Sequence, residues 1–112
     1  MEWKLIESAA QLEEVFQHSW EKPVAIFKHS KRCAISSMAL NRVERKWNFP
    51  PETIQPYFLD LWAFRSLSDE IAHRTGIRHE SPQLLLLYKG EVLYSASHHV
   101  IDINEVQAII PG

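Results

Sequence analysis

Apolar residues occur in two alternating patterns along this chain. Continuous runs, such as those from Val24 to Phe27 and from Leu84 to Leu87, are typical of strands that are buried on both faces. Between such runs the apolar residues recur every three or four positions, as at Ile35, Ala39 and Val43, which is the spacing of one helix face. The pattern predicts strands at 3–6, 24–27, 54–62, 83–88 and 91–96, and helices at 8–19, 33–47, 66–76 and 102–110.

Residues that typically begin or end helices support these boundaries. Three predicted helix starts have a capping residue with a partner three positions later: Ser8 with Gln11, Ser66 with Asp69, and Asp102 with Glu105. The predicted stops are Pro50–Pro51, Gly76 and Pro111–Gly112, and Lys89–Gly90 joins the last two strands as a hairpin.

The predicted order of elements is β-α-β-α-β-α-β-β-α, which is an α/β fold. Alternating strands and helices imply parallel pairing in the first part of the chain, and the final hairpin implies antiparallel pairing. We therefore predict a thioredoxin-like arrangement, with a central mixed sheet flanked by helices. No repeat, linker or low-complexity stretch interrupts the sequence, so residues 1–112 are expected to form one domain.

Composition places the chain among ordinary soluble proteins, with 46% hydrophobic and 23% charged residues. No apolar run approaches the roughly 20 residues that span a bilayer, and no secretory signal follows Met1. The single cysteine, Cys33, excludes an internal disulfide and a zinc site built on cysteine pairs. We expect a cytoplasmic protein without a membrane partner, because a lone reactive thiol persists where thiols are kept reduced.

Charge is unevenly distributed, although the net charge is only −2. Residues 28–46 contain six Lys or Arg and one Glu, whereas the rest of the chain contains six basic and thirteen acidic residues. At this size and net charge, the basic segment does not indicate nucleic acid; it suits an anionic small ligand, an acidic protein surface or a solvated helix face. Six histidines are present, but adjacent His98 and His99 point in different directions and no ligand spacing is evident, so no metal site is predicted.

The chemistry of the chain centres on Cys33, which lies where a buried strand passes into a helix. The free N–H groups and the positive dipole end of a helix start favour a thiolate over a thiol. Lys31 and Arg32 precede the cysteine, and His29 adds charge when it is protonated. Ser36 follows one helical turn later, where its hydroxyl is placed to donate a hydrogen bond to the thiolate. The pattern indicates a reactive nucleophile; the alternative is an inert cysteine that packs as a small hydrophobic residue.

This layout resembles the thioredoxin superfamily over nearly the whole chain. Its two markers are Cys33 after the second strand and Ser81–Pro82 before the leucine-rich strand. In that superfamily the proline is cis and faces the active-site cysteine, so the resemblance implies a cis Ser81–Pro82 bond beside Cys33. It also implies that the backbone of Ser81 pairs with a bound peptide or small-thiol ligand. An ordinary trans proline that opens a strand is the alternative.

The segment from His29 to Ser36, which reads HSKRCAIS, is similar to the YtxJ-like monothiol bacilliredoxins, whose active site reads Cys-Pro-Ile-Ser. The resemblance implies a thiol–disulfide oxidoreductase that removes bacillithiol from S-thiolated proteins. Cys33 is then the nucleophile and Ser36 occupies the resolving position. The resemblance implies no bound cofactor, and bacillithiol or another low-molecular-weight thiol is the co-substrate. The expected substrate-binding residues are Lys31, Arg32, Ala34, Ser81 and Pro82, and Ala34 departs from the family because proline is usual there.

Two other functions remain open at this point. One is a non-enzymatic interaction module that keeps the thioredoxin fold but has an inert Cys33. The other is a monothiol glutaredoxin that binds an iron–sulfur cluster with glutathione, which ranks last because the usual Cys-Gly-Phe-Ser is absent from the sequence.

Overall fold

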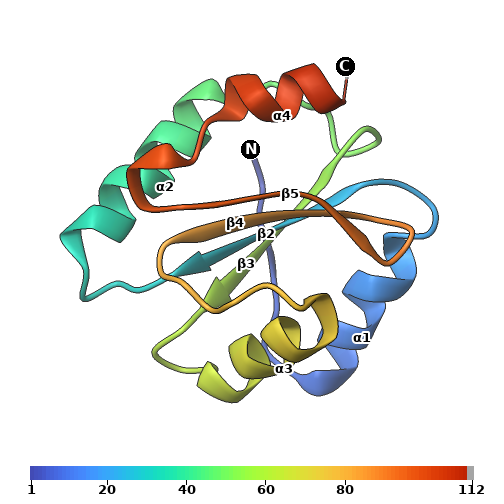
Figure 1. The fold of residues 1–112 in the computed structure, drawn as a ribbon, viewed down its shortest axis with the longest axis horizontal. Helices are drawn as coiled ribbons and strands as arrows, with labels where there is room; N and C mark the ends of the chain where they lie inside the picture. The colour runs from blue at the N-terminus through green and yellow to red at the C-terminus, as the bar shows by residue number, and fades with distance from the viewer. Residues whose placement is uncertain (111–112) are drawn as a thin grey trace.

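A five-stranded sheet with helices on both faces forms the protein, seen here in a computed structural model that describes residues 1–110 (Figure 1). The strands are β1 (Lys4–Leu5), β2 (Val24–His29), β3 (Gln55–Asp60), β4 (Gln83–Tyr88) and β5 (Glu91–Ser97). The helices are α1 (Ala9–His18), α2 (Ala34–Lys46), α3 (Arg65–Thr75) and α4 (Ile103–Ile109), with a short 3-10 helix η1 (His98–Val100) before α4. The predicted order of elements is confirmed, with η1 as an addition. Within residues 1–110, no helix is long and apolar enough to cross a membrane.

The sheet has the strand order β1-β3-β2-β4-β5. β3 runs parallel to β1 and β2, whereas β4 runs antiparallel to β2 and β5. The mixed sheet predicted from the sequence is therefore confirmed. Because β2 and β3 are parallel, their carboxyl ends meet at the same edge of the sheet, where His29 pairs with Asp60.

Alternate residues of the central strands fill two cores on opposite faces of the sheet. On one face, Val24 and Ile26 of β2 pack with residues of α1 and α3, including Ile71. On the other face, Ala25 and Phe27 pack with residues of α2 and α4. Figure 1 shows α2 and α4 on one side of the sheet and α1 and α3 on the other. Burial on both faces explains why the central strands read as continuous apolar runs.

Most of the predicted boundary signals are confirmed. Ser8 accepts a hydrogen bond from the Gln11 N–H (3.1 Å), Asp102 accepts one from the Asn104 N–H (2.9 Å), Gly76 ends α3 with φ +73°, and Lys89 and Gly90 turn the hairpin with φ +53° and +77°. Positive φ is the left-handed conformation that these turns require. The stop predicted at Pro111–Gly112 lies outside the described residues.

The predicted start of α3 is wrong. The helix begins one residue before Ser66, and Phe64 is its N-cap, so Ser66 lies inside the first turn and does not cap it. The cause lies upstream, where one carboxylate oxygen of Asp60 accepts hydrogen bonds from the N–H groups of Trp62 (3.0 Å) and Ala63 (3.4 Å). These bonds turn the chain directly after β3, so the helix starts earlier than the local sequence suggests.

Candidate active site

Cys33 lies at the junction between β2 and α2, as predicted. It is the N-cap residue of α2 and is partly exposed. Its backbone is held on both sides: its N–H donates to the carbonyl of Ser30 (3.1 Å), and its own carbonyl accepts from the N–H groups of Ser36 (3.1 Å) and Ser37 (3.2 Å). The cysteine is therefore fixed at the positive end of the helix, where the first N–H groups have no acceptor within the helix.

Ser36 connects the turn of residues 30–33, called the cysteine turn below, to the end of β2. Its side chain is fully buried, and its Oγ accepts a hydrogen bond from the backbone N–H of Ser30 (3.1 Å). The same oxygen lies 2.7 Å from Nδ1 of His29, the last residue of β2. Among the hydrogen bonds of residues 1–110, none joins Ser36 to the sulfur of Cys33. In this arrangement Ser36 holds the turn, and its expected bond to the thiolate remains a prediction.

His29 is a buried ring on the α2 face of the sheet. It is only 8% exposed and lies beside the rings of Phe27 and Phe58, at centroid distances of 6.2 and 5.4 Å. Burial is the largest influence on the pKa of His29 and lowers it below the ordinary 6.5. The neutral form of the ring is therefore favoured, and His29 supplies less positive charge beside Cys33 than an exposed histidine would.

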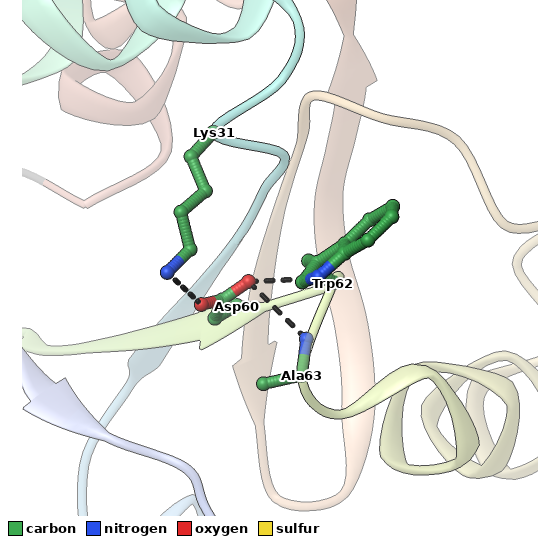
Figure 2. Close-up of polar contacts among 4 residues, drawn as sticks. All are labelled: Lys31, Asp60, Trp62 and Ala63. Carbon is green, nitrogen blue, oxygen red and sulfur yellow. Dashed lines mark hydrogen bonds and ion pairs between the residues drawn. The ribbon is translucent and has the colours of Figure 1, made fainter.

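Lys31 is paired with a carboxylate at the end of the neighbouring strand. Its Nζ lies 3.2 Å from one oxygen of Asp60, and Figure 2 shows the other oxygen of Asp60 facing the backbone of Trp62 and Ala63. Burial tends to raise the pKa of Asp60, but the hydrogen bond from Lys31, the two backbone N–H groups and the charge of Lys31 lower it below its usual value. Asp60 thus connects the cysteine turn to the turn that follows β3.

Arg32 makes a different contact in the same turn. Its guanidinium carbon lies 3.6 Å from the centroid of the Trp62 ring, so the cation is stacked on the indole. Stacking uses the face of the guanidinium and leaves its N–H edge free. No hydrogen bond or ion pair within residues 1–110 involves Arg32, and Trp62 is itself 61% exposed. The two adjacent cations therefore differ: the charge of Lys31 is paired, and that of Arg32 is oriented but unpaired.

Ser81 and Pro82 lie at the same end of the sheet as Cys33. Their peptide bond is cis, as predicted. The carbonyl of Pro82 accepts a hydrogen bond from the N–H of His98 (3.0 Å), and β4 begins at the next residue, where it pairs with the end of β2. Among the backbone hydrogen bonds of residues 1–110, none involves the N–H or carbonyl of Ser81. Ser81 is partly exposed.

A second polar group lies on the α3 face, directly behind the site. Lys28 is fully buried, and its Nζ donates to the carbonyl of Ser68 at 3.3 Å. Ser68 is buried too, and its Oγ lies 2.8 Å from Nδ1 of His79. Burial lowers the pKa of Lys28 to about 8. Gln83 faces Lys28 across the two strands, and its side-chain oxygen is buried without a partner among residues 1–110.

The structure gathers the predicted site residues at one end of the sheet, although they come from separate segments. Lys31, Arg32 and Ala34 are exposed around Cys33, and Ser36 is buried beneath it. Within residues 1–110, no three His, Cys, Asp or Glu side chains come together as metal ligands.

Two residues of this site, Asp60 and Trp62, were not predicted from the sequence. A signal for them existed, because Asp60 falls within the predicted third strand near its carboxyl end. Carboxyl ends of parallel strands share an edge of the sheet, which places this segment next to the turn that carries Cys33. In contrast, the residues next to His29 in the sequence did not indicate that its ring would be buried.

Comparison with solved structures places this architecture in a known class. The chain superposes with a TM-score of 0.77 and 30% identity on a protein described as a candidate oxidoreductase with a thioredoxin fold, over 97% of this chain and 93% of that one. It also matches a thioredoxin from Malassezia sympodialis (TM-score 0.71, 22% identity, 98% and 89% covered) and one from Fasciola hepatica (TM-score 0.71, 13% identity, 96% of each chain covered). The fold and the cysteine at its strand–helix junction define a redox protein of the thioredoxin class.

A family model narrows the assignment further. The model described as monothiol bacilliredoxin BrxC matches residues 4–106, which is most of the chain. The chain belongs to the monothiol bacilliredoxin BrxC family, and it is a thiol–disulfide oxidoreductase with a single cysteine. The predicted family is thus confirmed, and the two alternative functions are not supported.

Proposed function

We propose that the protein removes a low-molecular-weight thiol, bacillithiol in the first instance, from protein mixed disulfides through Cys33. The observation that carries this proposal is the position of the only cysteine: a partly exposed N-cap residue at the positive end of α2. A thiolate is the species that attacks disulfides, and the start of a helix is a position that suits anionic groups in general.

The transfer is a single exchange of sulfur partners. The Cys33 thiolate attacks the small-thiol sulfur of the mixed disulfide, so a new disulfide forms between Cys33 and the small thiol. The substrate protein leaves as a thiolate and takes a proton from water. Because the chain has no second cysteine, an external thiol, either a small thiol or the thiol of another redox protein, must then attack the adduct. This step releases Cys33 and forms a disulfide between the attacking thiol and the small thiol.

The surroundings of Cys33 support roles for the other site residues. The unpaired backbone of Ser81, next to Pro82, suits an extended segment of the S-thiolated protein. Ala34 offers a backbone N–H at the first position of α2, which proline would lack. We assign the free N–H edge of Arg32 to an anionic group of the small thiol, and Lys31 to support of the turn through Asp60.

Exposed apolar side chains near the cysteine suit a protein as the substrate. Ile35, Met38 and Trp62 are 54%, 63% and 61% exposed, and all three belong to the elements that surround Cys33. Apolar groups gathered on a surface are typical of protein contacts. We further propose that the reaction takes place in the cytoplasm, where small thiols keep Cys33 reduced between cycles. This function requires no bound cofactor and no nucleic acid or membrane partner.

The test is transfer followed by intact mass spectrometry. A single-cysteine protein carrying bacillithiol is mixed with the enzyme, and we expect the enzyme to gain the mass of one bacillithiol while the substrate loses it. Cys33→Ala should gain nothing. If iodoacetamide alkylates Cys33 but neither bacillithiol nor glutathione mixed disulfides modify it, the transfer function is wrong.

A second measurement distinguishes the role of Arg32 from that of Lys31. Arg32→Gln should slow transfer of a carboxylate-bearing thiol about fivefold relative to transfer of neutral 2-mercaptoethanol, which corresponds to the roughly 1 kcal/mol of an exposed charge pair. Lys31→Gln serves as the matched control and should change both rates equally, because Lys31 is already paired with Asp60. Equal effects of Arg32→Gln on both thiols would refute the assignment of Arg32.

A further inference from the structure

The Ser36 hydroxyl can make only a limited number of hydrogen bonds. It carries one hydrogen and two lone pairs, and one lone pair accepts the Ser30 N–H. The 2.7 Å contact with Nδ1 of His29 then has two possible forms. If Nδ1 has no proton, Ser36 donates its only hydrogen to His29. If Nδ1 has a proton, His29 donates to Ser36, and the serine hydrogen is released for another acceptor.

Few hydrogen-bond acceptors lie near the released hydrogen. Ser36 is fully buried, so water is not available as an acceptor. Side chains in an α-helix lean toward its N-terminus, and the neighbour of Ser36 in that direction, three residues earlier, is Cys33. The carbonyl of Cys33 already accepts the N–H groups of Ser36 and Ser37, so we assign the released hydrogen to the cysteine sulfur.

Charged groups from three elements face His29 and influence its proton. They are Asp60 at the end of β3, Lys31 in the cysteine turn and Glu44 on α2. Burial outweighs them and lowers the pKa of the ring. We assign the neutral ring its Nε2–H tautomer, which leaves Nδ1 as an acceptor and makes the first form of the contact the resting one.

We propose that His29 is a positioning residue for the Cys33 reaction: it holds the Ser36 hydroxyl hydrogen while Nδ1 is free, and releases it toward the Cys33 sulfur when Nδ1 takes a proton from water. Ser36 then stabilises the thiolate only in the protonated state of its neighbour. The inference rests on the proposed role of Cys33 as the nucleophile, but not on which small thiol it carries.

The chain offers a matched control for this arrangement. Ser68 and His79 make the same hydroxyl–Nδ1 contact at 2.8 Å, also with a fully buried serine. Their contact lies on the opposite face of the sheet, behind Lys28, and no hydrogen bond within residues 1–110 joins either side chain to the cysteine turn. Substitutions in this second pair report general damage to a buried serine–histidine contact.

The first experiment records nitrogen chemical shifts of labelled histidine in the unmodified protein as a function of pH. At neutral pH we expect Nδ1 of His29 to have the shift of an unprotonated nitrogen that accepts a hydrogen bond, with the proton on Nε2. In Ser36→Ala, the Nδ1 shift of His29 should move while that of His79 stays. A neutral His29 that carries its proton on Nδ1 would refute the proposal. This measurement uses the unmodified protein, so it does not depend on whether a variant folds.

The second experiment measures the rate of Cys33 alkylation by iodoacetamide, a neutral probe. A hydrogen bond to the thiolate contributes about 1.5–3 kcal/mol and raises the thiolate population about tenfold or more, but it lowers intrinsic nucleophilicity by roughly half of that effect on a logarithmic scale. The rate ratio of the unmodified protein to Ser36→Ala should therefore be close to one at pH 8 and rise about threefold or more as His29 becomes protonated.

The same ratio in two other backgrounds decides the mechanism. In His29→Asn the ratio should not depend on pH, because no proton is taken up, whereas in His79→Asn the rise should persist. Replacing Ser68 by Ala should leave the alkylation rate at every pH within the scatter of the unmodified protein. A pH-independent ratio in the unmodified protein, or an equal rise in His29→Asn, overturns the inference. Failure of bacillithiol transfer together with an intact rise would instead refute the proposed substrate.

Discussion

Two buried serines each contact Nδ1 of a histidine, and the two pairs lie on opposite faces of the same end of the sheet. On the α2 face, Ser36 contacts His29 and also accepts the N–H of Ser30, so its oxygen is used twice within the turn that carries the cysteine. On the α3 face, Ser68 contacts His79, and its carbonyl receives the buried ammonium of Lys28 at a long 3.3 Å. The chemistry of the two contacts is alike, but their surroundings differ.

The difference lies in how completely the buried polar atoms are satisfied. Opposite Lys28, the buried side-chain oxygen of Gln83 has no partner within residues 1–110. A buried cation with one hydrogen bond opposes folding, whereas a fully bonded hydroxyl fixes geometry. The contacts that position Cys33 therefore lie on the α2 face of the sheet, and the buried charge that lowers stability lies on the α3 face.

The largest expected effect comes from removing the buried cation. Lys28→Met should raise the free energy of unfolding at pH 7 by about 3 kcal/mol, because a charge whose pKa is lowered to about 8 is held at a cost in the fold. The folded pKa lies below the unfolded value, so the unfolded chain binds the proton more tightly. The stability of the unmodified protein should therefore rise between pH 8 and 10.5, and this part of the rise should be absent in the variant.

Urea unfolding at pH 7 and at pH 9.5 tests this prediction. Lys4→Met, at an exposed position, is the control and should change the free energy by no more than about 0.5 kcal/mol. If Lys28→Met is no more stable than the unmodified protein at pH 7, the buried ammonium of Lys28 does not destabilise the fold.

The second prediction compares the two serines directly. Ser36→Ala should cost about 2 kcal/mol, because it leaves both the Ser30 N–H and His29 without a partner in a buried place. Ser68→Ala should cost about 1 kcal/mol, since only the side chain of His79 loses a partner and that ring is partly exposed. Urea unfolding at pH 7 measures both values, and equal losses would show that the two contacts do not differ in surroundings.

A third prediction concerns the carboxylate that completes the α2 face. Asp60→Asn keeps an oxygen for the N–H groups of Trp62 and Ala63 but loses the charge that pairs with Lys31, and it should cost about 1 kcal/mol at pH 6. Since the folded pKa of Asp60 is lowered, its contribution is present above the ordinary value of 3.8 and is lost as pH falls through the lowered value.

The exposed pair of Asp69 with Arg65 is the matched control for this measurement. Both side chains of that pair are 65% exposed, so Asp69→Asn should cost about 0.3 kcal/mol. The two variants are compared by thermal or urea unfolding between pH 6 and 3. A cost for Asp60→Asn that does not decrease at all between pH 6 and 3 would contradict the role of its charge.

The smallest expected effect is a change in the pH dependence of the free energy of unfolding, not a loss of stability at one pH. The folded pKa of His29 lies below 6.5, so the unfolded chain binds the proton more readily, and the contribution of the neutral ring is present above pH 6.5 and lost as pH falls. His29→Asn should therefore flatten the decline in stability from pH 7 to 5, as measured by urea unfolding. His73→Asn, at an exposed position, should keep the full decline. An unchanged slope in His29→Asn would mean that burial does not control this ring.

The sequence alone determined those parts of the protein that depend on neighbouring residues. The order of strands and helices followed from apolar spacing, because periods of two and 3.6 are local properties of the backbone. The position of Cys33 at a helix start, the left-handed stop at Gly76 and the hairpin at Lys89–Gly90 are local in the same sense. The resemblance to a monothiol bacilliredoxin rested on a short segment and Pro82, and the match to the family model supports it.

Only the tertiary structure decided how the charges around the cysteine are used. Lys31 and Arg32 look equivalent in the sequence, but the parallel register of β2 and β3 brings Asp60 to one cation and Trp62 to the other. The burial of His29 likewise depends on packing against Phe58, from a strand about thirty residues away. Such contacts are absent from local sequence patterns, because a pairing register between distant strands sets them, and burial then determines which groups carry charge.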